Sequence, residues 1–460
     1  MDWNSCFSTR RILSKAGEEK SNHRSPFSRD ADRIIFSDPF RRLQDKTQIF
    51  SLPGSAFVHN RLTHSLEVAS VGRSLGAIAG RRICEIHSKS LNNRSKVFYR
   101  EELSDVIYAA CLAHDIGNPA FGHSGEDAIC SFFTNNAEMR VEGVVLKDFF
   151  EQKAWTDLTN FEGNANALRI LAGERKGIKP WALNPTTTTI ATLTKYPCES
   201  DGSRGKKGAL HRKKFGFLQS EMDLFKALAD ELNLIRESEN PMVYLRHPFV
   251  FLLEAADDIC YNLVDLEDAA RLNIISYPEA RDLLGELLDS YGQNDGSFSG
   301  KSYMSKDPLQ RLSYLRAKCI GLLIDDCANA FVDNAEKIIL GKLQTPLIKI
   351  TKPDTEMALN TIKTISQEKI YNSESVVRME LAGYRIFSHL LELMVPAVLK
   401  QKPDGQDKKT HMMIPEAYRP EPDSTPFEKM LCLIDFLSSM TDNYALEIYK
   451  NTTGIEMPHH

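Results

Sequence analysis

The stretch LSDVIYAACLAHDIGNPAFGHSGEDAI, residues 103–129, joins a helix with a buried face to a cluster of polar residues at its end. Apolar positions three and four residues apart predict the helix, and His114 falls on its inward face. We expect the helix to stop at Asp115, because Gly117 can adopt a left-handed cap and Pro119 pushes its predecessor out of helical geometry. At such a free helix end, an adjacent histidine and aspartate can both turn toward one cation.

A second inward-facing histidine lies 50 residues earlier in the chain. The segment RLTHSLEVASVGRSLGAIAG, residues 61–80, predicts a long helix. His64 lies in line with Val68 and Leu75 on the buried face of that helix. Taken alone, such a histidine is more often a hydrogen-bonded core residue than a metal ligand, so His64 is a ligand candidate only in combination.

A third predicted helix, FLLEAADDICYNLVDLEDAA at residues 251–270, carries carboxylates on an otherwise apolar surface. Its polar side chains share one stripe at three- and four-residue spacing: Glu254, Asp257, Tyr261, Asp265 and Asp268. The stripe could be the solvated side of an amphipathic helix. Leucines and alanines cover so much of the circumference that we favour burial, where carboxylates are costly unless they are paired or bind a cation.

Together, the three helices predict one divalent-metal site. Two neutral imidazoles and two or three carboxylates make a mixed nitrogen and oxygen ligand set. This set suits a borderline or hard cation such as Mn²⁺, Mg²⁺ or Fe²⁺ better than a thiolate-rich structural zinc. The nine cysteines are scattered singly without a CxxC pair, and we expect them to be reduced core residues.

His123 is the candidate for proton transfer beside the metal. An imidazole titrates near neutral pH, and Glu126 could fix its tautomer and raise its basicity. Ser124 and Asp127 resemble a capping box, which would place both residues at a helix N-terminus that favours an anionic ligand. The alternative is that His123 only caps or packs. Whether it would donate a proton to a leaving oxygen or help to activate water is open at this point.

The composition is that of a globular protein with a large helical core. The chain has 460 residues, of which 42% are hydrophobic, enough for one large domain or two closely joined ones. Helical patterns dominate and strand-like runs are few, which predicts an all-α fold. No run of 18 apolar residues and no secretory signal is present, so we expect a cytoplasmic protein without membrane contact. The formal charge of −5 gives no overall attraction to nucleic acid.

Breaks in the helical pattern indicate three regions. Residues 1–30 are polar and rich in arginine, lysine and serine, which is typical of a flexible arm that orders only by docking. Residues 31–285 contain the core, interrupted by an exposed basic loop at residues 198–216. A second break near residues 289–307 introduces a C-terminal helical region, residues 286–460.

Longer blocks around these residues resemble a known family. The order H…HD…D resembles the HD phosphohydrolases, and the longer blocks resemble the bacterial dGTP triphosphohydrolases and, more distantly, the vertebrate SAM and HD domain dNTP hydrolase. The blocks are RRLQDKTQIF, NRLTHSLEV, AHDIGNPAFGHSGE, FEGNANALRIL, LTKYP, EAADDICYNLVDLEDA and FLSSMTDNYA. The resemblance implies an all-α HD-domain core with an additional C-terminal helical region and a homo-oligomer such as a hexamer. It also implies hydrolysis of a dNTP, dGTP above all, to deoxynucleoside and inorganic triphosphate.

The resemblance also implies roles for single residues. The metal ligands would be His64, His114, Asp115 and Asp257, holding Mn²⁺ or Mg²⁺, with Fe²⁺, Co²⁺ or Ni²⁺ as alternatives. Asp257 is preferred to Asp258 because Tyr261 then lies four residues after the ligand, on the same helical face. His123 and Glu126 would be catalytic. Seven residues would bind substrate, with Gln48 at the 3′ hydroxyl and Arg61 and Lys195 at phosphates: Gln48, Arg61, Asn118, Asn164, Lys195, Tyr261 and Asp265.

Five basic residues gather in the loop predicted at residues 198–216. They are Lys206, Lys207, Arg212, Lys213 and Lys214, followed by two phenylalanines. A run like this is usually a solvated loop. The alternative is an electrostatic landing site for single-stranded DNA or a regulatory nucleotide, whose affinity would fall steeply with salt.

Two other functions are compatible with the same residues. The chain could be a different HD phosphohydrolase that acts on a cyclic nucleotide or a nucleoside monophosphate. It could also be a nucleotide- or DNA-binding regulator without turnover, although the four ligand candidates and His123 argue against a degenerate site. The products of hydrolysis separate the first alternative from triphosphate release, and binding without turnover would identify the second.

Overall fold

The computed structural model describes residues 1–13, 24–50, 58–173, 183–205, 208–292 and 307–457. These residues form a predominantly helical protein with two short antiparallel hairpins, so the predicted all-α fold is confirmed. Among them, no helix is both long and apolar enough to cross a membrane. All nine cysteines are free thiols and seven are buried, as their scattered positions predict.

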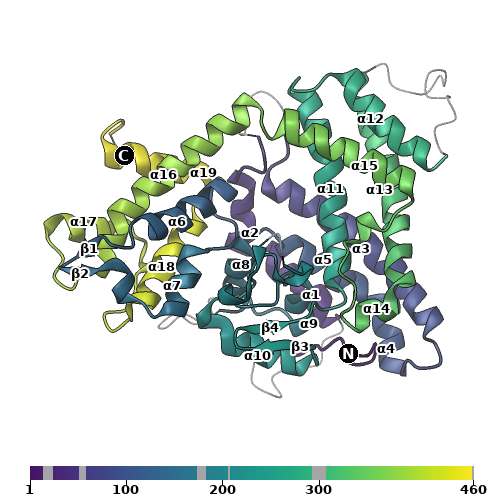
Figure 1. The fold of residues 1–460 in the computed structure, drawn as a ribbon, viewed down its shortest axis with the longest axis horizontal. Coiled ribbons are helices and arrows are strands. Elements are labelled where there is room, and N and C mark those ends of the chain that lie inside the picture. The colour runs from purple at the N-terminus through teal and green to yellow at the C-terminus, as the bar shows by residue number, and fades with distance from the viewer. Residues whose placement is uncertain (14–23, 51–57, 174–182, 206–207, 293–306, 458–460) are drawn as a thin grey trace.

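Three helices form the centre of the molecule (Figure 1). They are α3 (Arg61–Ile86), α5 (Leu103–Ala113) and α11 (Val250–Arg271). They pack on one another through the apolar faces that the sequence predicts. Gly80 of α3 allows the residues just before α5 to pass close to α3. A Cβ at Gly80 would lie 2.0 Å from the carbonyl oxygen of Tyr99.

Further helices cover this centre. Helix α1 (Pro26–Ile35) packs on α5, and α13 (Pro308–Asp333) packs on both α3 and α11. The remaining helices around the centre are α2 (Asp38–Arg41), α4 (Asn93–Val97), α12 (Tyr277–Ser290), α14 (Ala335–Ile339) and α15 (Pro353–Ile365). Figure 1 shows α12–α15 together on one side of the molecule.

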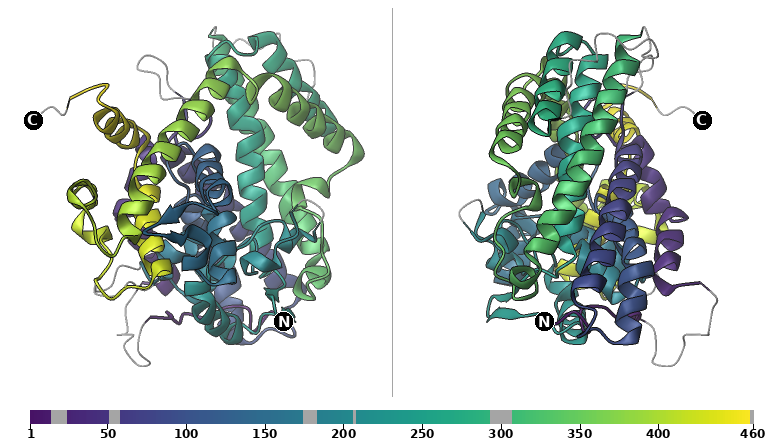
Figure 2. Two further views of the ribbon diagram at one scale, coloured as in Figure 1. Left: turned by 60° about the vertical axis from the view of Figure 1, so that its left-hand side comes forward. Right: turned by 90° about the vertical axis from the view of Figure 1, so that its right-hand side faces the viewer.

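A second apolar cluster lies on the opposite side (Figures 1 and 2). It joins α6 (His123–Asn135) and α7 (Gln152–Thr159) to α16 (Glu374–Leu399), α17 (Gly405–Met413), α18 (Pro426–Ser439) and α19 (Asp442–Thr453). The hairpin of β1 (Arg140–Val141) and β2 (Val144–Val145) follows α6. Segments more than 200 residues apart in sequence therefore share this cluster.

A third apolar cluster is smaller. It contains α8 (Gly163–Ala172), α9 (Thr187–Leu193), α10 (Met222–Glu231) and the antiparallel hairpin of β3 (Arg236–Glu239) and β4 (Met242–Tyr244). The main apolar cluster includes Val68 of α3, Leu312 of α13 and Val376 of α16. One apolar core therefore contains residues from both sides of residue 285, and the region after residue 285 is helical as expected.

The described residues of the predicted N-terminal arm, 1–13 and 24–30, dock on the rest of the chain, whereas residues 14–23 lie outside the described residues. Trp3 and Cys6 are buried, and the carbonyl oxygen of Cys6 accepts a hydrogen bond from Nε2 of His247 at 2.8 Å. Burial lowers the pKa of His247 to about 4, which keeps the ring neutral. Helix α1 begins at Pro26, so the last residues of the predicted arm are helical.

The loop at residues 198–216 differs from the expected exposed segment. Lys206 and Lys207 lie outside the described residues. Phe215 is buried, Arg212 pairs with Glu237, and Lys214 pairs with Glu162 at 2.8 Å. Aromatic residues after the basic run anchor the loop, so its described part is mostly packed against the body.

Candidate functional site

A cavity of about 510 Å³ lies between the central helices and the C-terminal helices. Its walls come from α3, the end of α5, the start of α6, α11 and α16, together with the segment that precedes α3. The predicted residues that line it are Gln48, Arg61, His64, His114, Asp115, Asn118, His123, Asn164, Lys195, Asp257 and Tyr261. Side chains that lie more than 200 residues apart in sequence thus line one cavity.

The predicted metal ligands face one another. The nitrogen and oxygen atoms that His64, His114 and Asp115 offer all lie within 4.8 Å of one another. Asp257 Oδ1 lies 3.3 Å from Nε2 of His64 and 3.5 Å from Nε2 of His114. Two ligand atoms that each lie about 2.1 Å from a cation are separated by roughly 3 to 4 Å. The donor set and its spacing therefore fit a divalent cation.

The end of α5 sets the orientation of two of these ligands. The helix ends at Ala113, and Nδ1 of His114 donates to the carbonyl oxygen of Cys111 at 2.7 Å, which orients Nε2 toward Asp257 Oδ1, 3.5 Å away. Gly117 does not have the positive φ of a left-handed cap. It is required for another reason, since a Cβ there would lie 2.1 Å from the carbonyl oxygen of Gly163 in α8.

Positively charged neighbours hold the two carboxylates in their ionised form. Burial alone would raise the pKa of Asp257, but Lys195, whose Nζ lies 2.6 Å from Oδ2, and the nearby histidines keep it well below its usual range. Burial has the same effect on Asp115, where His114 and Arg61 outweigh it and lower the pKa. Arg61 donates to Asp115 Oδ2 at 2.8 Å. The site therefore keeps two negative charges ready for a cation.

His123 and Glu126 form the predicted pair. Nδ1 of His123 lies 2.7 Å from Glu126 Oε2, and this hydrogen bond raises the pKa of His123. The His123 side chain is 79% exposed and lines the cavity, whereas Glu126 is buried behind it and also accepts from the backbone N of Gly163. Helix α6 begins at His123, but its N-cap is Gly122, without a side-chain cap bond. The expected capping box of Ser124 and Asp127 is therefore wrong.

Asp265 is the one predicted substrate-binding residue that does not line the cavity. It is buried on α11 and accepts a hydrogen bond from the hydroxyl of Tyr371 at 2.9 Å. Tyr371 stacks on Tyr261, with 5.4 Å between ring centroids, and both tyrosines line the cavity. Asp265 thus acts on the cavity wall through Tyr371, which the sequence did not single out.

Several other cavity residues also escaped sequence reasoning. Lys214 was assigned to an exposed loop, yet it lines the cavity and donates to Glu162. Tyr371, Met379 and Glu380 arrive from a distant segment at the start of α16. Tyr371 precedes α16, and Met379 and Glu380 lie in its first two turns, so helical periodicity alone does not single them out.

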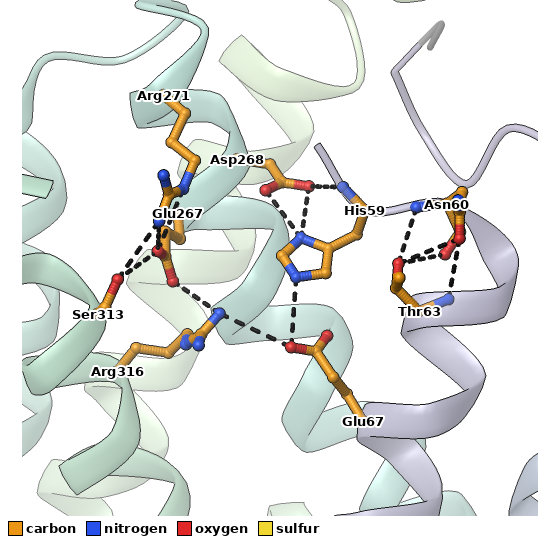
Figure 3. Close-up of polar contacts among 9 residues, drawn as sticks. All are labelled: His59, Asn60, Thr63, Glu67, Glu267, Asp268, Arg271, Ser313 and Arg316. Atoms are coloured by element: carbon orange, nitrogen blue, oxygen red, sulfur yellow. Dashed lines mark hydrogen bonds and ion pairs between the residues drawn. The ribbon is translucent and has the colours of Figure 1, made fainter. Parts of the chain in front are cut away.

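A network of charged side chains ties α3, α11 and α13 together (Figure 3). Asp268 of α11 accepts hydrogen bonds from the backbone N and the ring Nδ1 of His59, each at 2.8 Å. Glu67 lies 3.2 Å from the other ring nitrogen, and Arg316 pairs with Glu267 at 2.7 Å. Burial would lower the pKa of His59, but Asp268 and Glu67 raise it to about 10. The protonated ring fixes the start of α3 against α11, two of the three helices that present ligand candidates.

Comparisons with known proteins agree with this arrangement. The HD domain family matches residues 61–177, and the phosphohydrolase-associated domain family matches residues 350–451. A deoxyguanosinetriphosphate triphosphohydrolase-like protein of Synechocystis is 35% identical, over 99% of this chain and 100% of the relative. Another from Pseudomonas aeruginosa is 34% identical over the full length of both chains. A deoxyguanosinetriphosphate triphosphohydrolase of Yersinia enterocolitica is 32% identical, over 80% of this chain and 76% of the relative.

Proposed function

The chain belongs to the deoxyguanosinetriphosphate triphosphohydrolase-like family of HD-domain phosphohydrolases, and on this basis we propose that it hydrolyses dGTP, in preference to other deoxynucleoside triphosphates, to deoxynucleoside and inorganic triphosphate. The convergence of His64, His114 and Asp115 on one point, beside the His123–Glu126 pair, is the observation that carries this proposal. A cavity of about 510 Å³ is large enough for a nucleotide.

Three cations of the cavity wall complement a triphosphate. Arg61, Lys195 and Lys214 line the cavity, and each is paired with a carboxylate at 2.6 to 2.8 Å. Arginine offers a fork of donors to phosphate oxygens, and lysine offers a point charge. We infer that these residues bind the phosphate chain and place its first phosphorus next to the metal ligands.

Gln48 is suited to reading the sugar. Its Oε1 atom is buried and has no hydrogen-bond partner among the described residues, although the side chain lines the cavity. A 3′ hydroxyl could donate to this oxygen. An analogue without that hydroxyl would leave a buried acceptor unpaired, which is the kind of mismatch that enzymes reject strongly. Asn118, Asn164 and Tyr261 would complete the contacts to the sugar and phosphates.

The protein's own contribution to the chemistry is centred on His123. When bound by His64, His114, Asp115 and Asp257, Mn²⁺ or Mg²⁺, or alternatively Fe²⁺, Co²⁺ or Ni²⁺, supplies charge neutralisation at the phosphoryl oxygens. Water forms the new bond to the first phosphorus as the bond to the 5′ oxygen breaks, and His123, whose pKa is raised by its hydrogen bond to Glu126, donates a proton to the departing 5′ oxygen. Arg61 and Lys195 hold Asp115 and Asp257 in place throughout.

We also infer the location and the partners of the enzyme. Nine free thiols suit a reducing compartment, so we infer a cytoplasmic location. We also infer a homo-oligomer, because the family resemblance implies one. The basic loop is a weaker candidate for binding DNA or a regulatory nucleotide, since Arg212 and Lys214 are already paired with acidic residues.

The function is tested by product analysis. Purified protein is incubated with Mn²⁺ or Mg²⁺ and each of the four dNTPs, and nucleosides, nucleotides and phosphates are separated. We expect deoxynucleoside and triphosphate in equal amounts, fastest with dGTP. Asp257→Ala should abolish turnover, whereas Asp325→Ala, an exposed acid on α13, should leave it unchanged. Monophosphate or diphosphate products would indicate another HD phosphohydrolase, and nucleotide binding without turnover would indicate a regulator.

A further inference from the structure

Asp442, the first residue of α19, connects two segments of the cavity wall that lie far apart in sequence. Its Oδ2 atom accepts a hydrogen bond from the backbone N of Thr47 at 2.8 Å. Its Oδ1 atom accepts one from the backbone N of Phe121 at 2.9 Å. The side chain is buried, so each oxygen is committed to one backbone donor in a place where water competes little.

The two segments carry the groups that the proposed reaction needs most. Thr47 directly precedes Gln48, the proposed reader of the 3′ hydroxyl. Phe121 lies two residues before His123, the proposed proton donor. Thr47, Gln48, Phe121 and His123 all line the cavity. Asp442 therefore spans the sugar-binding and proton-transfer sides of one site.

Thr47, Gln48, Phe121 and Gly122 all lie outside the helices. Phe121 and Gly122 have φ values of 58° and 56°, and a positive φ is strained for a non-glycine residue such as Phe121. Thr47 makes an isolated bridge to Asn60, and its hydroxyl donates to the sulfur of Met379 at 3.7 Å. Bonds from outside these segments must therefore fix their conformation.

Lys46 adds a second connection between the same parts. Its ammonium group is buried and donates to the carbonyl oxygen of Asn118 and to that of Ser438, each at 2.7 Å. Ser438 lies at the end of α18, four residues before Asp442. The corner between α18 and α19 thus holds the Gln48 segment and the His123 segment through two independent sets of bonds.

We propose that Asp442 is a positioning residue that, together with Lys46, sets the spacing between Gln48 and His123 in the catalytic cavity. This inference rests on the proposed function. It gives the phosphohydrolase-associated part of the chain, residues 350–451, a direct role in a site whose metal ligands all lie outside it. The role is one of geometry, because Asp442 does not line the cavity.

The test uses Asp442→Asn, in which one of the two oxygens becomes an amide that cannot accept a hydrogen bond. We expect kcat/KM for dGTP to fall at least about tenfold, since small displacements in an active site are costly. We also expect the preference for dGTP over 2′,3′-dideoxy-GTP to shrink, because Gln48 would no longer be held against the 3′ hydroxyl. In the Gln48→Ala background, Asp442→Asn should reduce that preference no further.

Asp404→Asn is the matched control. Asp404 also accepts two backbone N–H bonds, from Gln406 at 2.8 Å and Asp407 at 2.9 Å, but it caps α17, away from the cavity. It should lower the melting temperature without changing the preference for the 3′ hydroxyl. Mn²⁺ affinity and the melting temperature of Asp442→Asn are measured alongside, and we expect Mn²⁺ binding to be retained.

An unchanged preference for dGTP over 2′,3′-dideoxy-GTP in Asp442→Asn would overturn the proposal. A loss of activity that is explained entirely by a loss of Mn²⁺ binding would also overturn it. If Asp442→Asn does not fold, Lys46→Met and Asp442→Glu are tested instead. The preference of each for dGTP over 2′,3′-dideoxy-GTP must then be smaller than that of the native protein. If the native protein releases no triphosphate, the proposed function fails. The positioning role is then judged by the ratio of binding affinities for dGTP and the dideoxy analogue, which must still fall in the variant.

Discussion

Glu126 has the largest influence on the charge state of His123. The hydrogen bond to Glu126 raises the pKa of His123, while Lys214 and Arg61 act in the opposite direction. If protonated His123 donates the proton, activity is lost as the pH rises through that pKa. Glu126→Gln removes the carboxylate, so the pKa of His123 falls and the alkaline limb of the kcat profile should move to lower pH.

This prediction is checked by measuring kcat from about pH 5.5 to 9.5 for both proteins. Asp127→Asn serves as the control, since Asp127 is the next residue of α6 and is exposed. An alkaline limb that stays in place in Glu126→Gln would show that His123 is not the titrating donor.

At the scale of residues, sequence could place side chains whose environment follows from their own helix. His64, His114 and Asp257 lie on the faces that helical periodicity predicts, and the structure brings them together. Asp265 shares that periodicity with Tyr261, but a hydrogen bond from Tyr371 keeps it out of the cavity. A partner more than 100 residues away leaves no trace in the local pattern, so neither Tyr371 nor the role of Asp442 could be predicted.

Between elements, Gly117 sets how closely the turn after α5 approaches α8. A Cβ at this position would lie 2.1 Å from the carbonyl oxygen of Gly163 and 2.3 Å from the backbone N of Ala167. Backbone atoms cannot move aside without shifting the helix. Gly117→Ala should therefore destabilise the protein by about 2 kcal/mol or more in urea unfolding and lower its activity.

Gly321→Ala is the control for this substitution. Gly321 lies on α13, and a Cβ there would meet nothing within 4 Å. Alanine in this helix should be neutral or stabilise by about 0.5 to 1 kcal/mol. Equal stability of the two variants would contradict the close approach.

The contact of α3 with α11 should depend on pH through His59. Its pKa is raised from 6.5 to about 10 in the fold, so the protonated ring stabilises the protein fully below about pH 6.5. That contribution decreases as the pH rises and is lost at about pH 10. The difference in unfolding free energy between the native protein and His59→Gln should shrink by up to about 1.4 kcal/mol per pH unit in this range. A difference that is constant from pH 6 to 10 would contradict the network.

Helix boundaries were predictable where capping and breaking residues act locally. Pro308 follows the N-cap Asp307 at the start of α13, and α5 ends where Pro119 approaches. The N-cap of α6 was not predictable, because Gly122 and Phe121 adopt positive φ values that bonds from other segments hold in place. Local chemistry therefore gave the helices, while long-range contacts shaped the turns that bear the site.

In the whole molecule, helices that are far apart in sequence pack on one another. A polar break near residue 290 suggested a boundary, but α13 packs on α3 and α11, and α16 packs on α6. The cavity lies where these early and late segments meet. Composition and periodicity reveal which helices have apolar faces, but they do not show which faces meet.

In the proposed reaction, this cavity cleaves the bond between the first phosphorus and the 5′ oxygen of a deoxynucleoside triphosphate. The most direct test is hydrolysis of dGTP in ¹⁸O-labelled water with Mn²⁺, followed by mass spectrometry of the products. We predict one labelled oxygen in intact triphosphate and none in deoxyguanosine. Label in the deoxyguanosine, or in monophosphate or pyrophosphate in place of triphosphate, would contradict the claim.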